Sequence, residues 1–180
     1  FPGTFLALKN KITYLKKLGV TTIELMPVYE FEEMMIPPVS KLPDYIQWNP
    51  KEEDQILPSD EPQADPKVNY WGHVEGNYFA VKASYASKPK DASAEYKALI
   101  KKLHDNYMEC IMEMFFPEDI DHNLVLEALH YWVREYHVDG FHLLGGNLPM
   151  TAIVQDNMLS RTKIFYTGFD ANICTIQRKY

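Results

Sequence analysis

Residues near position 140 are placed where an enzyme would carry its reacting groups. Residues 131–136 end an amphipathic helical pattern, Asp139-Gly140 forms a tight turn, and the apolar run through Leu144 has the composition of a buried parallel strand. In a β/α barrel, chemistry is carried at the carboxyl ends of such strands. This end holds His142 and Leu144. The stretch therefore has the layout of an enzyme strand, but its tip carries no carboxylate.

Alternating helical and extended patterns indicate the elements that would position this tip. Helices are expected over residues 4–18, 93–106, 123–136 and 150–159, and strands over residues 20–27, 108–116, 138–144 and 161–167. This order of helix and strand is typical of parallel strands joined by right-handed crossovers. Four strands do not close a barrel of eight. The predicted fold class is therefore α/β, a partial (β/α)8 TIM barrel.

A proline-rich connection interrupts this alternation. The chain has 12 prolines, most of which lie between residues 27 and 66, and the segment 28–67 is polar. We expect it to be a loop excursion within a single domain spanning residues 1–180, either a solvated insertion or a loop that shapes a substrate cleft. Aromatic residues follow it, among them Tyr70 and Trp71. They would either pack beneath the loop or stack on the faces of sugars.

Composition narrows the classes of partner. The chain has 180 residues, of which 46% are hydrophobic and 24% charged, as in an ordinary globular domain. Its net charge of -7 argues against nucleic acid and against an anionic membrane surface as partners. A neutral ligand or a protein partner fits better. No run of apolar residues approaches the ~18 needed for a membrane helix.

Two cysteines do not make a disulfide framework, which favours a cytoplasmic location without establishing it. We expect no cofactor and no metal, because the spacing of His122, His130 and His137 matches no metal site. The start of the chain lacks the features of a signal peptide. The helix-first order implies a preceding strand before Phe1.

Three stretches resemble one known family, in that family's order. They are residues 3–31, with Leu-Gly-Val-Thr-Thr-Ile-Glu-Leu-Met-Pro, residues 69–86, with Asn-Tyr-Trp-Gly, and residues 129–141, with Tyr-Trp-Val-Arg-Glu-Tyr-His-Val-Asp-Gly-Phe. These resemble the α-amylase family, glycoside hydrolase family 13, especially its pullulanases, isoamylases and glycogen debranching enzymes. The resemblance covers nearly the whole chain. It implies that the strands are roughly the second to fifth of a barrel that acts on α-glucans such as starch, glycogen and pullulan.

The resemblance also shows where the catalytic pattern departs. A retaining glycosidase needs a carboxylate nucleophile and a carboxylic acid on opposite sides of the scissile bond. In the family's fourth-strand motif, Asp-Gly-Phe-Arg-Phe-Asp, His142 takes the place of the Arg and Leu144 that of the nucleophile. Thr167 takes the place of the fifth-strand Glu, the general acid. Leucine cannot attack carbon, and a threonine hydroxyl is too weak an acid near neutral pH.

The third-strand pattern, Asp-Val-Val-Phe-Asn-His, matches residues 113–118 without its Asn and His, and His73 replaces the Tyr that stacks on sugar in the family. The last family carboxylate would lie beyond residue 180. The residues that the resemblance places around a substrate are Tyr70, Trp71, His73, Glu113, Glu118 and Asp170.

Three functions remain open. The first is a non-catalytic homologue that binds α-glucan or pairs with an active glucan-processing enzyme. The second is an active debranching hydrolase that uses displaced carboxylates, such as Glu113, Glu118 or Asp170. The third is a structural interaction domain that does not contact glucan.

Overall fold

The computed structural model describes residues 3–35 and 67–168 of the chain. Contacts divide the chain into a larger unit, residues 1–32 and 71–180, and a smaller unit, residues 33–70. Asp170, Cys174 and most of the predicted excursion lie outside the described residues. Cys110 is a free, buried thiol, and burial raises its pKa to about 12.

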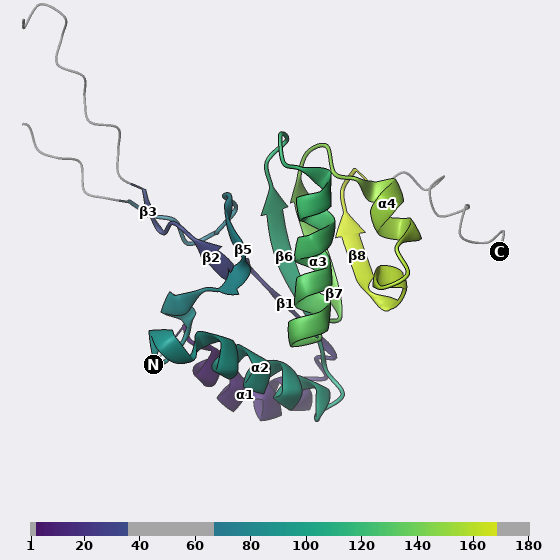
Figure 1. Cartoon of the computed structure of the whole chain (residues 1–180). Helices are drawn as coiled ribbons and strands as arrows, with labels where there is room; N and C mark the ends of the chain where they lie inside the picture. Colours follow the sequence, from purple (N-terminus) through teal and green to yellow (C-terminus); the bar gives the residue numbers. More distant parts are fainter. Residues whose placement is uncertain (1–2, 36–66, 169–180) are drawn as a thin grey trace, which may run out of the picture. The chain divides into compact units, whose positions relative to one another are not determined.

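A four-stranded sheet lies at the centre of the larger unit (Figure 1). Its strands, in spatial order, are β1 (Thr22–Leu25), β6 (Glu109–Phe116), β7 (Gly140–Gly145) and β8 (Lys163–Tyr166). All neighbouring pairs are parallel. The predicted α/β class and the four predicted strands are confirmed, and their carboxyl ends share one edge of the sheet.

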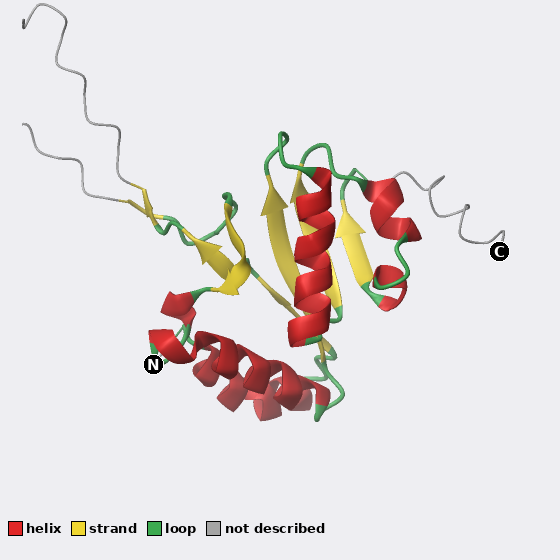
Figure 2. Ribbon diagram, in the orientation of Figure 1, coloured by secondary structure: helices red, strands yellow, loops and turns green. Residues whose placement is uncertain are grey.

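Helices connect these strands as the alternating pattern predicted (Figure 2). They are α1 (Phe5–Lys17), α2 (Ala92–His104), α3 (His122–Tyr136) and α4 (Met150–Gln155), with 3-10 turns at Ala83–Tyr85, Pro89–Asp91 and Leu159–Arg161. Helix α1 begins where Oγ1 of Thr4 accepts a hydrogen bond from the amide of Ala7. Helix α3 begins at Asp121, whose carboxylate accepts from two amides, and it ends at His137 in the left-handed conformation.

The two faces of β6 differ in burial. Cys110, Met112, Met114 and Phe116 are fully buried with the helices, and burial of each Met or Phe contributes about 1.5–3 kcal/mol. Because side chains alternate along a strand, Glu109, Glu113 and Phe115 lie on the opposite, partly exposed face. In a barrel that face is the interior, so the helices leave the polar side of the sheet available for a site.

The expectation of a polar excursion from Val28 is wrong for residues 28–31. Val28, Tyr29 and Phe31 are buried, and β2 (Tyr29–Phe31) pairs antiparallel with β5 (Gly76–Val81). Such a short strand gives little periodic signal, and its partner is distant in sequence. In the smaller unit, β3 (Met34–Met35) pairs with β4 (Lys67–Val68).

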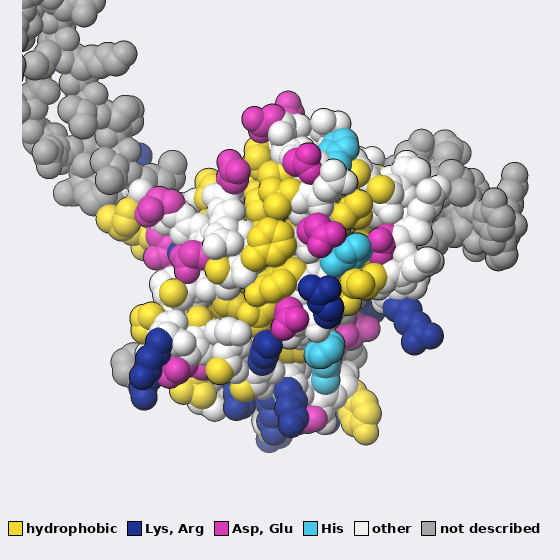
Figure 3. Space-filling model, viewed as in Figure 1, with side chains coloured by type: hydrophobic (Ala, Val, Ile, Leu, Met, Phe, Trp, Pro, Cys, Tyr) yellow, Lys and Arg dark blue, Asp and Glu magenta, His cyan; other side chains and the backbone are white. Residues whose placement is uncertain are grey.

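Charge is unevenly distributed over the face shown in Figure 3. Lys and Arg side chains gather over α1 and α2, whereas carboxylates mark the loop beyond the carboxyl end of β6. No helix within residues 3–35 and 67–168 has the length and apolar character to cross a membrane.

Candidate functional site

Polar side chains form two tiers on the interior face of the sheet. The lower tier lies near the amino ends of the strands and contains Thr22, Glu109 and Lys163. Oγ1 of Thr22 donates to Oε2 of Glu109 over 2.9 Å, and Nζ of Lys163 donates to the same oxygen. The hydrogen bond from Lys163 is the largest cause that lowers the pKa of Glu109, and the hydrogen bond from Thr22 is the second. This tier is electrically balanced and has a structural role.

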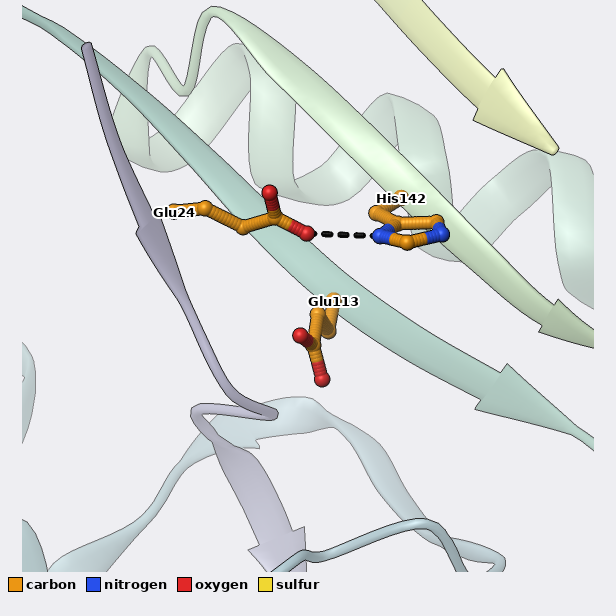
Figure 4. Close-up of side chains that lie close together, drawn as sticks. All are labelled: Glu24, Glu113 and His142. Carbon is orange, nitrogen blue, oxygen red and sulfur yellow. Dashed lines mark hydrogen bonds and ion pairs between the residues drawn. The ribbon is translucent and has the colours of Figure 1, made fainter.

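The upper tier contains Glu24 of β1, Glu113 of β6 and His142 of β7 (Figure 4). Nδ1 of His142 lies 2.6 Å from Oε1 of Glu24. Glu113 and His142 are direct partners in the β6–β7 register. One ligand atom from each residue lies within 4.8 Å of the other two. Side chains of three neighbouring strands thus bring two carboxylates and one imidazole close together.

His73, from the loop before β5, extends this tier. Its Nε2 lies 2.8 Å from Oε2 of Glu113. The hydroxyl of Tyr29 fixes the loop on both sides of His73, because it lies 3.1 Å from the carbonyl of Gly72 and 2.8 Å from that of Val74. Burial raises the pKa of Tyr29, so its hydroxyl remains a donor. The position of His73 is therefore set by the buried core.

The aromatic segment contains both buried and exposed rings. Tyr78 is buried and donates from its hydroxyl to the carbonyl of Phe115 over 3.0 Å, so it packs. Trp71 is 68% exposed, and its ring centroid lies 6.3 Å from that of His73. Tyr70 is also exposed and falls in the smaller unit. Trp71 and His73 present a joint aromatic surface beside Glu113.

The tips of β7 and β8 carry apolar or weakly polar side chains. Leu144 pairs in register with Phe115, and Gly145 pairs with Phe116. Gly145 has φ +111°, and an added Cβ would lie 1.9 Å from the carbonyl oxygen of Phe116. Thr167, just past β8, is exposed. Within the described residues, these two tips provide neither a nucleophilic nor an acidic carboxyl group.

Glu118 lies away from the upper tier, in the loop after β6. A Cβ added to Gly146 would lie 2.8 Å from Cγ of Glu118, and Nδ2 of Asn147 donates to the carbonyl of Glu118 over 3.3 Å. Nearby, residues 147–152 line a pocket of about 450 Å³ together with Tyr166 and Gly168. Glu118 thus links the loop after β6 to the loop after β7, at the edge of the sheet where the carboxyl ends of the strands lie. Asp170 cannot be placed, since it lies outside the described residues.

Glu24 was not among the residues singled out from the sequence. The signal was present, because Thr22 and Glu24 alternate with the apolar Ile23 and Leu25 and so share one face of β1. The pairing of Glu24 with His142 could not be read from the sequence, since 118 positions separate them.

The sequence of the chain is similar to those of isoamylases and pullulanases. The chain is 28% identical to isoamylase 3, chloroplastic, of Oryza sativa, over 93% of this chain and 27% of that protein. It is 27% identical to pullulanase A of Streptococcus pneumoniae, over 77% of this chain and 13% of that protein. No model of a protein family matches. The chain spans about a quarter of the length of the isoamylases it matches, or less.

Solved structures share the fold. A pullulanase from Paenibacillus barengoltzii, solved with maltohexaose and α-cyclodextrin, has a TM-score of 0.52 and 20% identity over 78% of this chain and 26% of its own. A maltogenic α-amylase from Thermotoga neapolitana has a TM-score of 0.60 and 15% identity over 97% of this chain and 45% of its own. The sheet thus has the fold of part of a (β/α)8 barrel, and the chain is a relative of the debranching-type enzymes of glycoside hydrolase family 13.

Proposed function

We propose that this relative of the family 13 debranching enzymes is a non-catalytic domain that binds α-glucan. The observation that carries the proposal is the composition of the two strand tips. Leu144 and Thr167 occupy the positions that the family resemblance gives to the nucleophile and the acid. Retaining hydrolysis requires a carboxyl group at both positions.

Binding a sugar requires only a surface on which the sugar can stack and groups that hydrogen-bond its hydroxyls. Trp71, His73 and Glu113 offer both. Trp71 is exposed and lies beside His73, so the two rings offer a surface on which the apolar face of a glucose ring can stack. Next to them, Glu113 has an exposed side-chain fraction of 18%, and its carboxylate can accept hydrogen bonds from sugar hydroxyls. Aromatic stacking beside fixed acceptors is the arrangement expected of a sugar subsite.

Affinity electrophoresis of the whole chain in gels containing amylopectin or glycogen tests this proposal. The wild-type chain should be retarded relative to a gel without glucan, and Trp71→Ala should lose most of that retardation. Tyr14→Ala is the matched control, because Tyr14 is also an exposed aromatic, 58% accessible, but lies on α1. Its retardation should equal that of the wild type.

Two results of the electrophoresis would contradict the proposed glucan site. A wild-type chain that migrates equally with and without glucan contradicts glucan binding and supports a structural interaction domain, or pairing with an active glucan-processing enzyme. Equal retardation of Trp71→Ala and the wild type would place the glucan elsewhere on the chain.

One observation favours active hydrolysis as a second candidate. Carboxylate oxygens of Glu24 and Glu113 lie within 4.8 Å of each other, close to the ~5–5.5 Å that separates the carboxyl groups of retaining glycosidases. Both carboxylates, however, are already bound to imidazoles. Glu113 also lies three residues before the end of β6 at Phe116, whereas the chemistry of a barrel is carried at the strand ends. We therefore assign these carboxylates to binding.

A further inference from the structure

We propose that Glu24, Glu113 and His142 bind a divalent transition-metal ion, for which Zn²⁺ is the test ion. This proposal is independent of glucan binding. It arises from three donors on three neighbouring strands, which come together only in the folded sheet (Figure 4).

The donor atoms are close to a coordinating arrangement. One ligand atom from each of the three residues lies within 4.8 Å of the other two. Tetrahedral zinc with bonds of ~2.0–2.2 Å holds its donors about 3.3 Å apart. The donor separations span this value, since Nδ1 of His142 and Oε1 of Glu24 are 2.6 Å apart and no pair exceeds 4.8 Å, so an ion would replace the Glu24–His142 hydrogen bond after small side-chain rotations. The side chains of His142 and Glu24 are 31% and 46% exposed, which leaves them free to rotate, while the β6–β7 register keeps the backbones of Glu113 and His142 in place.

The charge of the upper tier favours a cation. Within residues 3–35 and 67–168, Glu24 and Glu113 form ion pairs with imidazoles and with no Lys or Arg. In the lower tier, by contrast, Lys163 pairs with Glu109. Two carboxylates with no Lys or Arg partner among the described residues lie at close range in the upper tier, and a divalent ion would balance their charge.

His73 provides the outer support that metal ligands need. Its ring lies 2.8 Å from Oε2 of Glu113, and the hydroxyl of Tyr29 holds the loop on either side of it. Such groups orient the ligands they contact and typically change metal affinity 10- to 100-fold. His73 is accordingly a positioning residue and not a ligand.

The donor set also selects the class of metal. One imidazole nitrogen with two carboxylates suits zinc, manganese or iron, whereas calcium and magnesium prefer oxygen ligands alone. The fourth coordination position of a tetrahedral ion would be open to water or to a sugar hydroxyl.

Isothermal titration of the whole chain, freed of metal with EDTA, tests the site with ZnCl₂ and, separately, MgCl₂. The wild type should bind one Zn²⁺ per chain and show no saturable binding of Mg²⁺. His142→Gln and Glu24→Gln should each weaken Zn²⁺ binding at least 10-fold. Both side chains are partly exposed, and an unchanged circular dichroism spectrum would confirm folding.

His104→Gln is the matched control. Nε2 of His104 lies 2.9 Å from Oδ2 of Asp139, a similar pair that is not in the group of three donors. This variant should bind Zn²⁺ as the wild type does. Wild-type affinity in His142→Gln, or an equal loss in His104→Gln, overturns the proposal. Absence of any saturable Zn²⁺ binding also overturns it, whatever the result of the glucan experiment.

Discussion

Nδ1 of His142 and Oε1 of Glu24 lie 2.6 Å apart, although their strands, β7 and β1, are separated by β6. By family resemblance His142 takes the place of an arginine that holds the nucleophile ionised. The nucleophile position here is Leu144, which offers no acceptor, and the imidazole pairs with β1 instead. The interior of the sheet thus keeps a polar tier in which the imidazole of β7 pairs with a carboxylate of β1.

Leu144→Asp tests whether a carboxylate at the nucleophile position is sufficient for hydrolysis. The variant should release no reducing sugar from pullulan above the background of the wild type, because Thr167 still leaves the site without a general acid. Reducing-sugar assays at high protein concentration measure this. Turnover in Leu144→Asp but not in Leu144→Asn would show that another group already serves as the acid.

Gly145→Ala should destabilise the chain by about 3 kcal/mol. At φ +111° its new Cβ would meet the carbonyl oxygen of Phe116 at 1.9 Å, so both strand ends must shift. Gly19→Ala separates this clash from backbone strain, since Gly19 has φ +84° but no atom within 4 Å of an added Cβ. It should cost about 1 kcal/mol in urea unfolding. Equal losses in the two variants would contradict the close approach of β6 and β7.

Glu109→Gln should lower stability at pH 7 by about 0.5 kcal/mol, a small effect because both side chains of the Lys163–Glu109 pair are more than a third exposed. The pKa of Glu109 is lowered from 4.5 by hydrogen bonds from Lys163 and Thr22. A carboxyl group with a lowered pKa contributes its stability above its ordinary pKa and loses it as the pH falls through the folded pKa.

The difference between wild type and Glu109→Gln, measured by urea unfolding, should therefore be constant from pH 7 to about 5 and shrink below about 4.5. A difference that grows as the pH falls would contradict the assigned pairing.

Sequence patterns predicted the main sheet because α1, α2 and α3 each bury an apolar face and the strands between them are short apolar runs. Residues 108–116, for example, predicted β6 because their apolar run is nearly continuous, as expected of a parallel strand. The same reasoning missed β2, where Tyr29–Phe31 is too short to show a period. Its burial depends on pairing with β5, which lies far along the chain.

The upper tier was only partly predictable. Glu113, His73 and His142 were singled out through family positions, but their partners depend on which strands are adjacent. Glu24 meets His142 because β1 and β7 both flank β6, a fact that no local pattern contains. Asp170 remains a predicted contact, since it lies outside the described residues.

A non-catalytic glucan-binding domain should release no sugar from a glucan that it binds, and one measurement decides this. Wild-type protein at high concentration should be incubated with pullulan, glycogen and amylopectin, and new reducing ends compared with a protein-free blank. We expect no increase in reducing ends, together with retardation of the same preparation by amylopectin. Turnover that Glu113→Gln or Glu24→Gln abolishes, and that His104→Gln leaves intact, would contradict this expectation and establish a hydrolase with displaced carboxylates.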